Sequence, residues 1–141
     1  IERARETGAN ADPAARQEIA KLMIRSKCAE WLARRARAAQ AEGRPQGPEG
    51  SLGKLAASAI ARQANEVHTM ISGADSMLTG EDSPRDGIIA EILVSTPALS
   101  IAGGTDEIQK NIIAERVLKM PKEPRSDTDR PFRDVPKNIV K

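Results

Sequence analysis

The feature that most constrains the fold is the long stretch 13–42, which holds no glycine and no proline after its first residue. Asp12 and Pro13 form a helix start signal, because aspartate favours the N-cap and proline the first helical position. Small and apolar residues then recur near the helical period: Ile19, Leu22, Met23, Ser26, Ala29, Leu32 and Ala36. Glycines and prolines in Gly43–Gly50 break the pattern. The sequence therefore predicts one long helix with a buried stripe.

Three shorter segments also have helical patterns. Ser51 is expected to cap a helix over 51–73. A third helix is predicted from Asp86 to about Ile101, interrupted or redirected at Pro97, because proline removes a helical hydrogen bond. A fourth is predicted over 105–119, with an apolar stripe that consists of Ile108, Ile112, Ile113 and Leu118.

Breaks between amphipathic helices favour an all-α fold, an antiparallel four-helix bundle over residues 1–120. Residues 1–7 are interpreted as the end of a helix, and a chain that begins with Ile1 is expected to be a fragment. The polar, proline-rich residues 121–141 are expected to form an extended tail that is mobile or lies along the surface. Alanine-rich helix faces would also suit packing between subunits.

Composition excludes several classes of protein. Aromatic residues are nearly absent, with only Trp31 and Phe132, which favours helix over sheet. No apolar run reaches membrane-spanning length, and a net charge of +2 is too balanced to predict nucleic-acid binding. Cys28 is the single cysteine, which fits a reducing compartment such as a bacterial cytoplasm or a mitochondrial matrix. His68 is the single histidine, so no metal site is expected.

Other residues with reactive or bulky side chains are assigned structural places. Cys28 is expected to be a small buried residue of its helix, since no base is positioned to activate it. Trp31 is expected to fill the core or an interface. The basic cluster Arg34–Arg37 is interpreted as a solvated helix end or a subunit contact.

The junction Gly103-Gly104-Thr105 is the best candidate for a binding site. Two glycines before a helix let another molecule approach the backbone, and the first helical N–H groups favour a phosphate-bearing or sugar-bearing ligand. Thr105 is predicted to be the N-cap, and Asp106 and Glu107 complement the helix dipole. On spacing alone, the same residues describe a well-capped amphipathic helix.

The string GGTDEIQKNIIAERVLKMP, residues 103–121, resembles the C-terminal signature of the FAD-dependent acyl-CoA dehydrogenases. Upstream segments agree in order, so the resemblance extends from residue 1 to about residue 123. It implies that the chain is the C-terminal helical bundle of a subunit that also has an N-terminal helical domain and a central β-domain. It further implies an acyl-CoA substrate, FAD as cofactor, and dimers or tetramers with FAD across a subunit interface.

The resemblance also assigns positions to the cofactor and the substrate. Thr105, Gly104 and Glu107 match the helix start that contacts the adenosine part of FAD. Ala102 and Gly103 match the residues that line the acyl thioester.

Three further positions match more distant FAD contacts. Gln17 matches a glutamine near the flavin nucleotide, with a plain helix-start residue as the alternative. Gly73 matches a glycine-bearing helix end that touches FAD from the neighbouring subunit, although the usual glutamine and double glycine are missing. Arg5, in Arg5-Glu-Thr7, matches an element that grips the pyrophosphate, but Gly8-Ala9 replaces the aromatic-glycine pair that normally follows.

The main departure from the family concerns the catalytic base. In many members it is the glutamate directly before the glycine and threonine of the signature, and Gly103 occupies that position here. The base would then lie on an earlier helix upstream of Ile1, or the chain would belong to a non-catalytic partner subunit in a mixed assembly. A free-standing helical interaction module is a third alternative.

Overall fold

The structure, a computed structural model, describes residues 1–45, 47–81, 83–122, 124 and 131–135. Its helices are α1 (Glu2–Glu6), α2 (Pro13–Ala41), α3 (Glu49–Ser72), α4 (Ile88–Leu99) and α5 (Asp106–Arg116). Short 3₁₀ turns occur at Ala9–Ala11, Gly73–Met77, Pro84–Gly87 and Phe132–Asp134. No strand occurs in these ranges, so the predicted all-α fold is confirmed.

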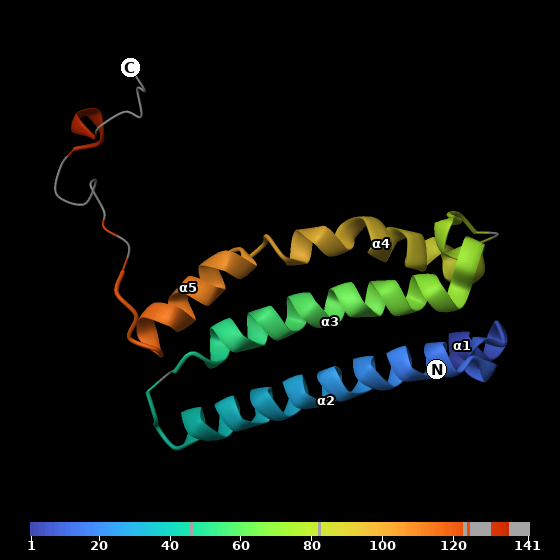
Figure 1. Cartoon of the computed structure of the whole chain (residues 1–141), viewed down its shortest axis with the longest axis horizontal. Helices are drawn as coiled ribbons and strands as arrows, with labels where there is room; N and C mark the ends of the chain where they lie inside the picture. The colour runs from blue at the N-terminus through green and yellow to red at the C-terminus, as the bar shows by residue number, and fades with distance from the viewer. Residues whose placement is uncertain (46, 82, 123, 125–130, 136–141) are drawn as a thin grey trace.

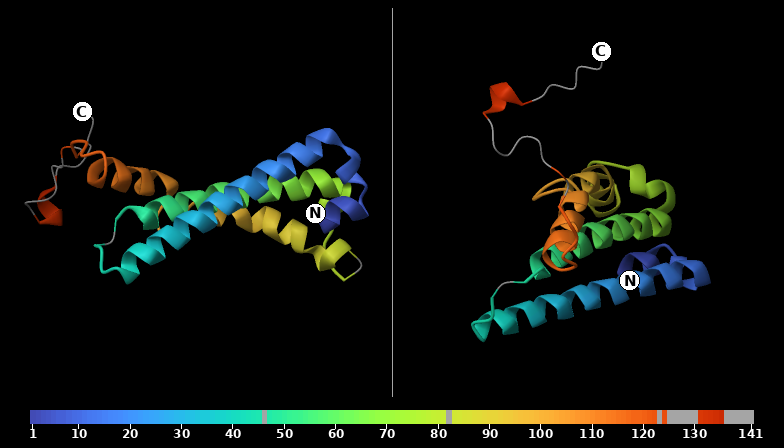
Figure 2. Two further views of the ribbon diagram at one scale, coloured as in Figure 1. Left: turned by 90° about the horizontal axis from the view of Figure 1, so that it is seen from below. Right: turned by 60° about the vertical axis from the view of Figure 1, so that its left-hand side comes forward.

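The central element of the bundle is α3. It packs against α2 on one side and against α4 and α5 on the other. The chain runs along α2, returns along α3, and runs back through α4 and α5, which follow one another in line (Figure 1). Consecutive layers are therefore antiparallel, as the two further views also show (Figure 2). This arrangement places the α4–α5 junction beside the N-terminal half of α3.

The hydrophobic core lies where α1, α2 and α3 meet. Ala4, Ala15, Val67 and Ile71 form its buried cluster. Arg3 closes this end, because its Nη2 lies 2.8 Å from Asp75 Oδ2 and its Nε donates to Ser72 Oγ at 3.1 Å. The small side chains of α1 and α2 let both helices approach α3 closely.

The boundaries of α2 match the prediction closely. Asp12 is its N-cap, with Oδ1 accepting a hydrogen bond from Ala14 N at 2.8 Å. The predicted stripe is only partly correct, because Met23 is 54% exposed and Ser26 is also exposed. The half-buried members are Ile19, Leu22, Ala29, Leu32 and Ala36. Among the described residues, α3 and the turn Ala9–Ala11 provide the main cover of α2.

Two side chains of α2 lie on its uncovered face. Cys28 is exposed, so the prediction of a buried cysteine is wrong. Trp31 is 57% exposed, which excludes the core and leaves the interface interpretation.

The predicted start of the second long helix is wrong. Ser51 lies inside α3 and is buried, and the N-cap is Pro48. Proline has a φ near the helical value and needs no N–H partner, so the helix begins directly after it.

The start of α4 also differs from the prediction. Arg85 and Asp86 have positive φ angles of 55° and 56°, and Gly87 has a φ of 77°. These left-handed conformations cannot continue a right-handed helix, so α4 begins at Ile88 rather than at Asp86. Pro97 lies within the last turn of α4, and the change of direction comes after Leu99.

The last helix, α5, is shorter than the predicted 105–119. Most of the predicted tail lies outside the described residues. Among those that are described, Phe132 is 94% exposed.

Candidate functional site

The corner between α4 and α5 is built on two left-handed glycines. Gly103 has a φ of 68° and Gly104 a φ of 93°, conformations that other residues rarely adopt. A side chain at Gly104 would come within 2.9 Å of Gln109 Nε2, and that same Nε2 donates to the Gly103 carbonyl at 3.1 Å. Thr105 is the N-cap of α5, as predicted, and its Oγ1 accepts from Ile108 N at 3.3 Å.

A charge cluster around the buried Asp106 fixes this corner to α3. Asp106 Oδ1 accepts a hydrogen bond from Lys54 Nζ at 2.8 Å, and Asp106 Oδ2 accepts one from Arg62 Nη1 at 3.0 Å. Lys54 also donates to the Ser100 carbonyl at 3.1 Å, and Arg62 to the Ser100 hydroxyl. Ser58 donates to the Leu99 carbonyl at 3.1 Å. Both ends of the corner are therefore held by side chains of one α3 face.

The hydrogen bond from Lys54, with a smaller contribution from Arg62, holds the pKa of Asp106 far below its usual range. Asp106 is therefore ionised at neutral pH and already accepts hydrogen bonds from two cations. A carboxylate with so low a pKa is a poor proton acceptor. It anchors the corner and does not serve as a catalytic base.

The predicted ligand positions at the corner face solvent. Ala102, Gly103 and Glu107 are exposed, and Gly104 and Thr105 are half-buried. Around Gly103 an added side-chain atom would meet nothing within 4 Å. The corner is therefore open to an approaching molecule.

The other predicted contacts lie at the opposite end of α3. Arg5 belongs to α1, Gln17 to the start of α2, and Gly73 follows the last residue of α3. All three are exposed. An α-helix rises about 1.5 Å per residue, so the two groups are on the order of 25–30 Å apart along α3. The chain does not bring its predicted FAD contacts into one place.

The predicted stripe of α5 does not form its main contact with α3. Ile108 is 50% exposed and Leu118 65% exposed, while Ile112 and Ile113 are half-buried. Asp106 and Gln109 are the buried residues instead. The helix turns this polar side inward because Asp106 pairs with the cations of α3.

The sequence contains a pattern that predicts the α3 residues that hold the corner. Lys54, Ser58 and Arg62 recur every four residues within the predicted second helix, so they share one face. Sequence patterns assign Asp106 only to the helix dipole and give Lys54 no role. The pairing needs the distance between two helices, which periodicity does not provide.

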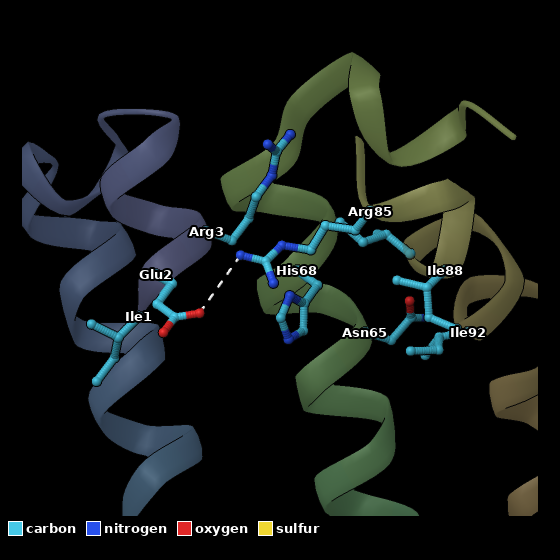
Figure 3. A pocket seen from close by; sticks show the side chains of 9 residues that line it. Ile1, Glu2, Arg3, Asn65, His68, Arg85, Ile88 and Ile92 are labelled. Atoms are coloured by element: carbon cyan, nitrogen blue, oxygen red, sulfur yellow. Dashed lines mark ion pairs between the residues drawn. The ribbon is translucent and has the colours of Figure 1, made fainter. Parts of the chain in front are cut away.

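A separate hollow of about 400 Å³ lies between α1, α3 and α4. Figure 3 shows Arg85 reaching toward Glu2, with their charged atoms 3.7 Å apart, and the ring of His68 near the Arg85 guanidinium. Burial lowers the pKa of His68, with positive charges nearby adding to the shift. Ile88 and Ile92 supply the apolar wall. None of the predicted cofactor or substrate residues lines this hollow.

Comparison with protein families matches residues 1–118 to the acyl-CoA dehydrogenase C-terminal domain. The chain belongs to the acyl-CoA dehydrogenase family. The match covers all five helices and the corner between α4 and α5. No curated protein and no solved structure matches the chain significantly.

This family membership makes the chain part of an acyl-CoA dehydrogenase, and the enzymes of this family are oxidoreductases. The described part of the chain holds no cluster of three or more histidine, cysteine or acidic side chains that could bind a metal ion. None of its described helices combines the length and the apolar character needed to cross a bilayer.

Proposed function

We propose that this domain supplies part of the FAD site of an acyl-CoA dehydrogenase that forms an α,β double bond in an acyl-CoA thioester. The observation that carries the proposal is the open α4–α5 corner. There the start of α5 presents the Thr105 hydroxyl, the Glu107 carboxylate and the Glu107 backbone N–H, which donates to none of the described residues. Such a set suits the hydroxyls of a ribose and the polar edge of a nucleotide.

The residues fit the adenosine half of FAD. The Thr105 oxygen accepts the capping hydrogen bond, and its O–H is free to donate to a ligand. Glu107 is bound only loosely, with 3.9 Å between its Oε1 and Lys110 Nζ. Gly103 leaves room for close approach of the ligand. FAD would supply the redox chemistry by accepting hydride from the β carbon of the substrate.

The distance between the two groups of predicted contacts favours a site shared between subunits. Thr105 of one copy would then meet Arg5 and Gln17 of another, in a dimer or tetramer. Arg5 forms no ion pair with the described residues, so its guanidinium is available for a pyrophosphate. Met23, Ile24 and Trp31 provide an exposed apolar strip on α2 for such assembly, at 54%, 62% and 57% exposure.

The base for proton abstraction is not provided by the corner. Gly103 has no side chain, and Asp106 is held ionised between two cations. We therefore infer that another part of the enzyme carries the base. The alternative is a non-catalytic subunit that binds little FAD beside an active partner, and the same glycine favours it. A free-standing interaction module is the third alternative.

This chain alone is expected to bind FAD at least about a hundredfold more weakly than the intact dehydrogenase. The reason is that only half of the cofactor's contacts would be present. Flavin fluorescence titration of both proteins measures the difference. Micromolar binding by this chain alone would contradict the shared site, and an intact protein without flavin absorbance would favour the non-catalytic subunit.

A further inference from the structure

A second pocket lies behind the corner, between the start of α3 and the inner side of α5. Its volume is about 500 Å³, and its polar lining includes Ser51, Lys54, Gln109 and Arg116. Gly103 forms part of its wall, while Thr105 and Glu107 do not line it. It is therefore adjacent to the proposed FAD contact but distinct from it.

The N-terminus of α3 opens into this pocket without a cap. Pro48 has no side chain that can cap the helix. Neither Glu49 N nor Ser51 N donates a backbone hydrogen bond to a residue outside the helix among those described. Ser51 is only 9% exposed, yet its hydroxyl has no hydrogen-bond partner among the described residues. The hydroxyl of this buried residue and the open N–H groups lie at one place, where they can donate to a partner with acceptor atoms.

The charge of the pocket identifies that partner as an anion. Lys54 and Arg62 share the single carboxylate of Asp106, so the anchor cluster keeps one positive charge. Lys54 Nζ has three donors and uses two of them, on Asp106 and on the Ser100 carbonyl. Arg116 lines the same pocket and forms no ion pair with the described residues.

Two acidic side chains near the pocket, Asp106 and Glu49, do not line it, and Asp106 is already paired with Lys54. Glu49 lies against Gly47 and lines the groove between α2 and α3 instead of this pocket. A helix N-terminus with a hydroxyl, an ammonium group and a guanidinium is a donor set that suits the oxygens of a phosphate group.

We propose that this pocket binds a phosphate group, with Ser51, Lys54, Arg116 and the first N–H groups of α3 as its donors. The group has two possible sources, a free phosphate ion or a terminal phosphate of coenzyme A. Binding of a free phosphate ion here does not depend on the proposed function, whereas the coenzyme A source rests on its acyl-CoA substrate.

The test is calorimetric titration of the full chain with inorganic phosphate, coenzyme A and dephospho-coenzyme A. Arg116→Gln and Ser51→Ala are each expected to weaken binding about tenfold, because each removes a donor to a charged oxygen. Lys110→Gln is the matched control, because Lys110 lies on the same helix, is exposed and does not line the pocket. Circular dichroism of each variant confirms that the helices remain.

The titrations with the three ligands distinguish the two sources of the phosphate group. Tighter binding of coenzyme A than of its dephospho form identifies the ligand's terminal phosphate, whereas binding of inorganic phosphate alone identifies the free ion. Absence of binding at 10 mM phosphate, roughly the weak limit of a specific site, together with equal affinities for coenzyme A and its dephospho form would overturn the proposal. So would an equal loss of affinity in Arg116→Gln and Lys110→Gln, since that result would reflect general charge only.

Discussion

Replacement of Gly87 by alanine is expected to destabilise the chain by about 2–5 kcal/mol. Two costs combine at this position. The backbone has a φ of 77°, which is unfavourable for a residue with a side chain. The added carbon would also lie 2.9 Å from Thr79 Cα and 3.2 Å from Gly80 N. Backbone atoms cannot move aside as a flexible side chain can, so the start of α4 would shift.

Gly8→Ala is the matched control for this substitution. Gly8 has nearly the same φ, 75°, but an added carbon there meets nothing within 4 Å. It should therefore cost only the conformational part, about 1–2 kcal/mol. Urea unfolding of the three proteins measures both values. Equal losses would show that the close approach at Gly87 contributes nothing.

Asp106→Asn is expected to lower the Tm at pH 7 by on the order of 5 °C or more. The substitution keeps the shape of the side chain but leaves Lys54 and Arg62 together without a carboxylate. Glu30→Gln is the control, because Glu30 also pairs with two cations, Lys27 and Arg34, but is more exposed than Asp106. It should change the Tm by no more than about 2 °C.

The effect of Asp106 should depend on pH in a defined direction. Its folded-state pKa is depressed, chiefly by the hydrogen bond from Lys54, so its stabilisation is complete above the unfolded-state pKa of about 3.9. The stabilisation is lost as the pH falls from there toward the folded-state pKa. The Tm difference between wild type and Asp106→Asn should thus stay constant from about pH 7 to 5 and shrink below about pH 4. A constant difference down to about pH 2.5 would contradict this account.

Local chemistry made the long helices predictable. Asp12 and Pro13 specify the start of α2 within a few residues, and the glycines and prolines of 43–50 specify its end. The cap at Thr105 was predicted for the same reason, because its hydroxyl acts on an N–H only three residues ahead.

Features that depend on packing were not predictable in this way. Positive φ angles at Arg85 and Asp86 arise where the chain turns between α3 and α4, and neither residue type signals them. Cys28 and Met23 are exposed because another face of α2 meets α3. The helical period alone leaves two neighbouring faces of α2 as candidates for the buried one. The inward turn of Asp106 reflects charges on another helix.

The candidate site was predictable in part: its local sequence pattern was visible, but its arrangement in space was not. The sequence identified the Gly103–Thr105 corner because glycine and a capping residue mark it directly. It did not separate Thr105 from Arg5 in space, because that distance is set by the length of α3. The positions of Arg5, Gln17 and Gly73 in the FAD site remain predictions.

The most direct test of the central claim measures the FAD affinity of the intact dehydrogenase with Glu107→Ala. Glu107 is exposed and pairs only loosely with Lys110, so its removal should leave the fold unchanged. Loss of a charged hydrogen bond to the cofactor should weaken FAD binding about tenfold or more, while Lys110→Ala should leave it within about twofold. Unchanged FAD affinity in Glu107→Ala would contradict the assignment of the α4–α5 corner as a nucleotide contact.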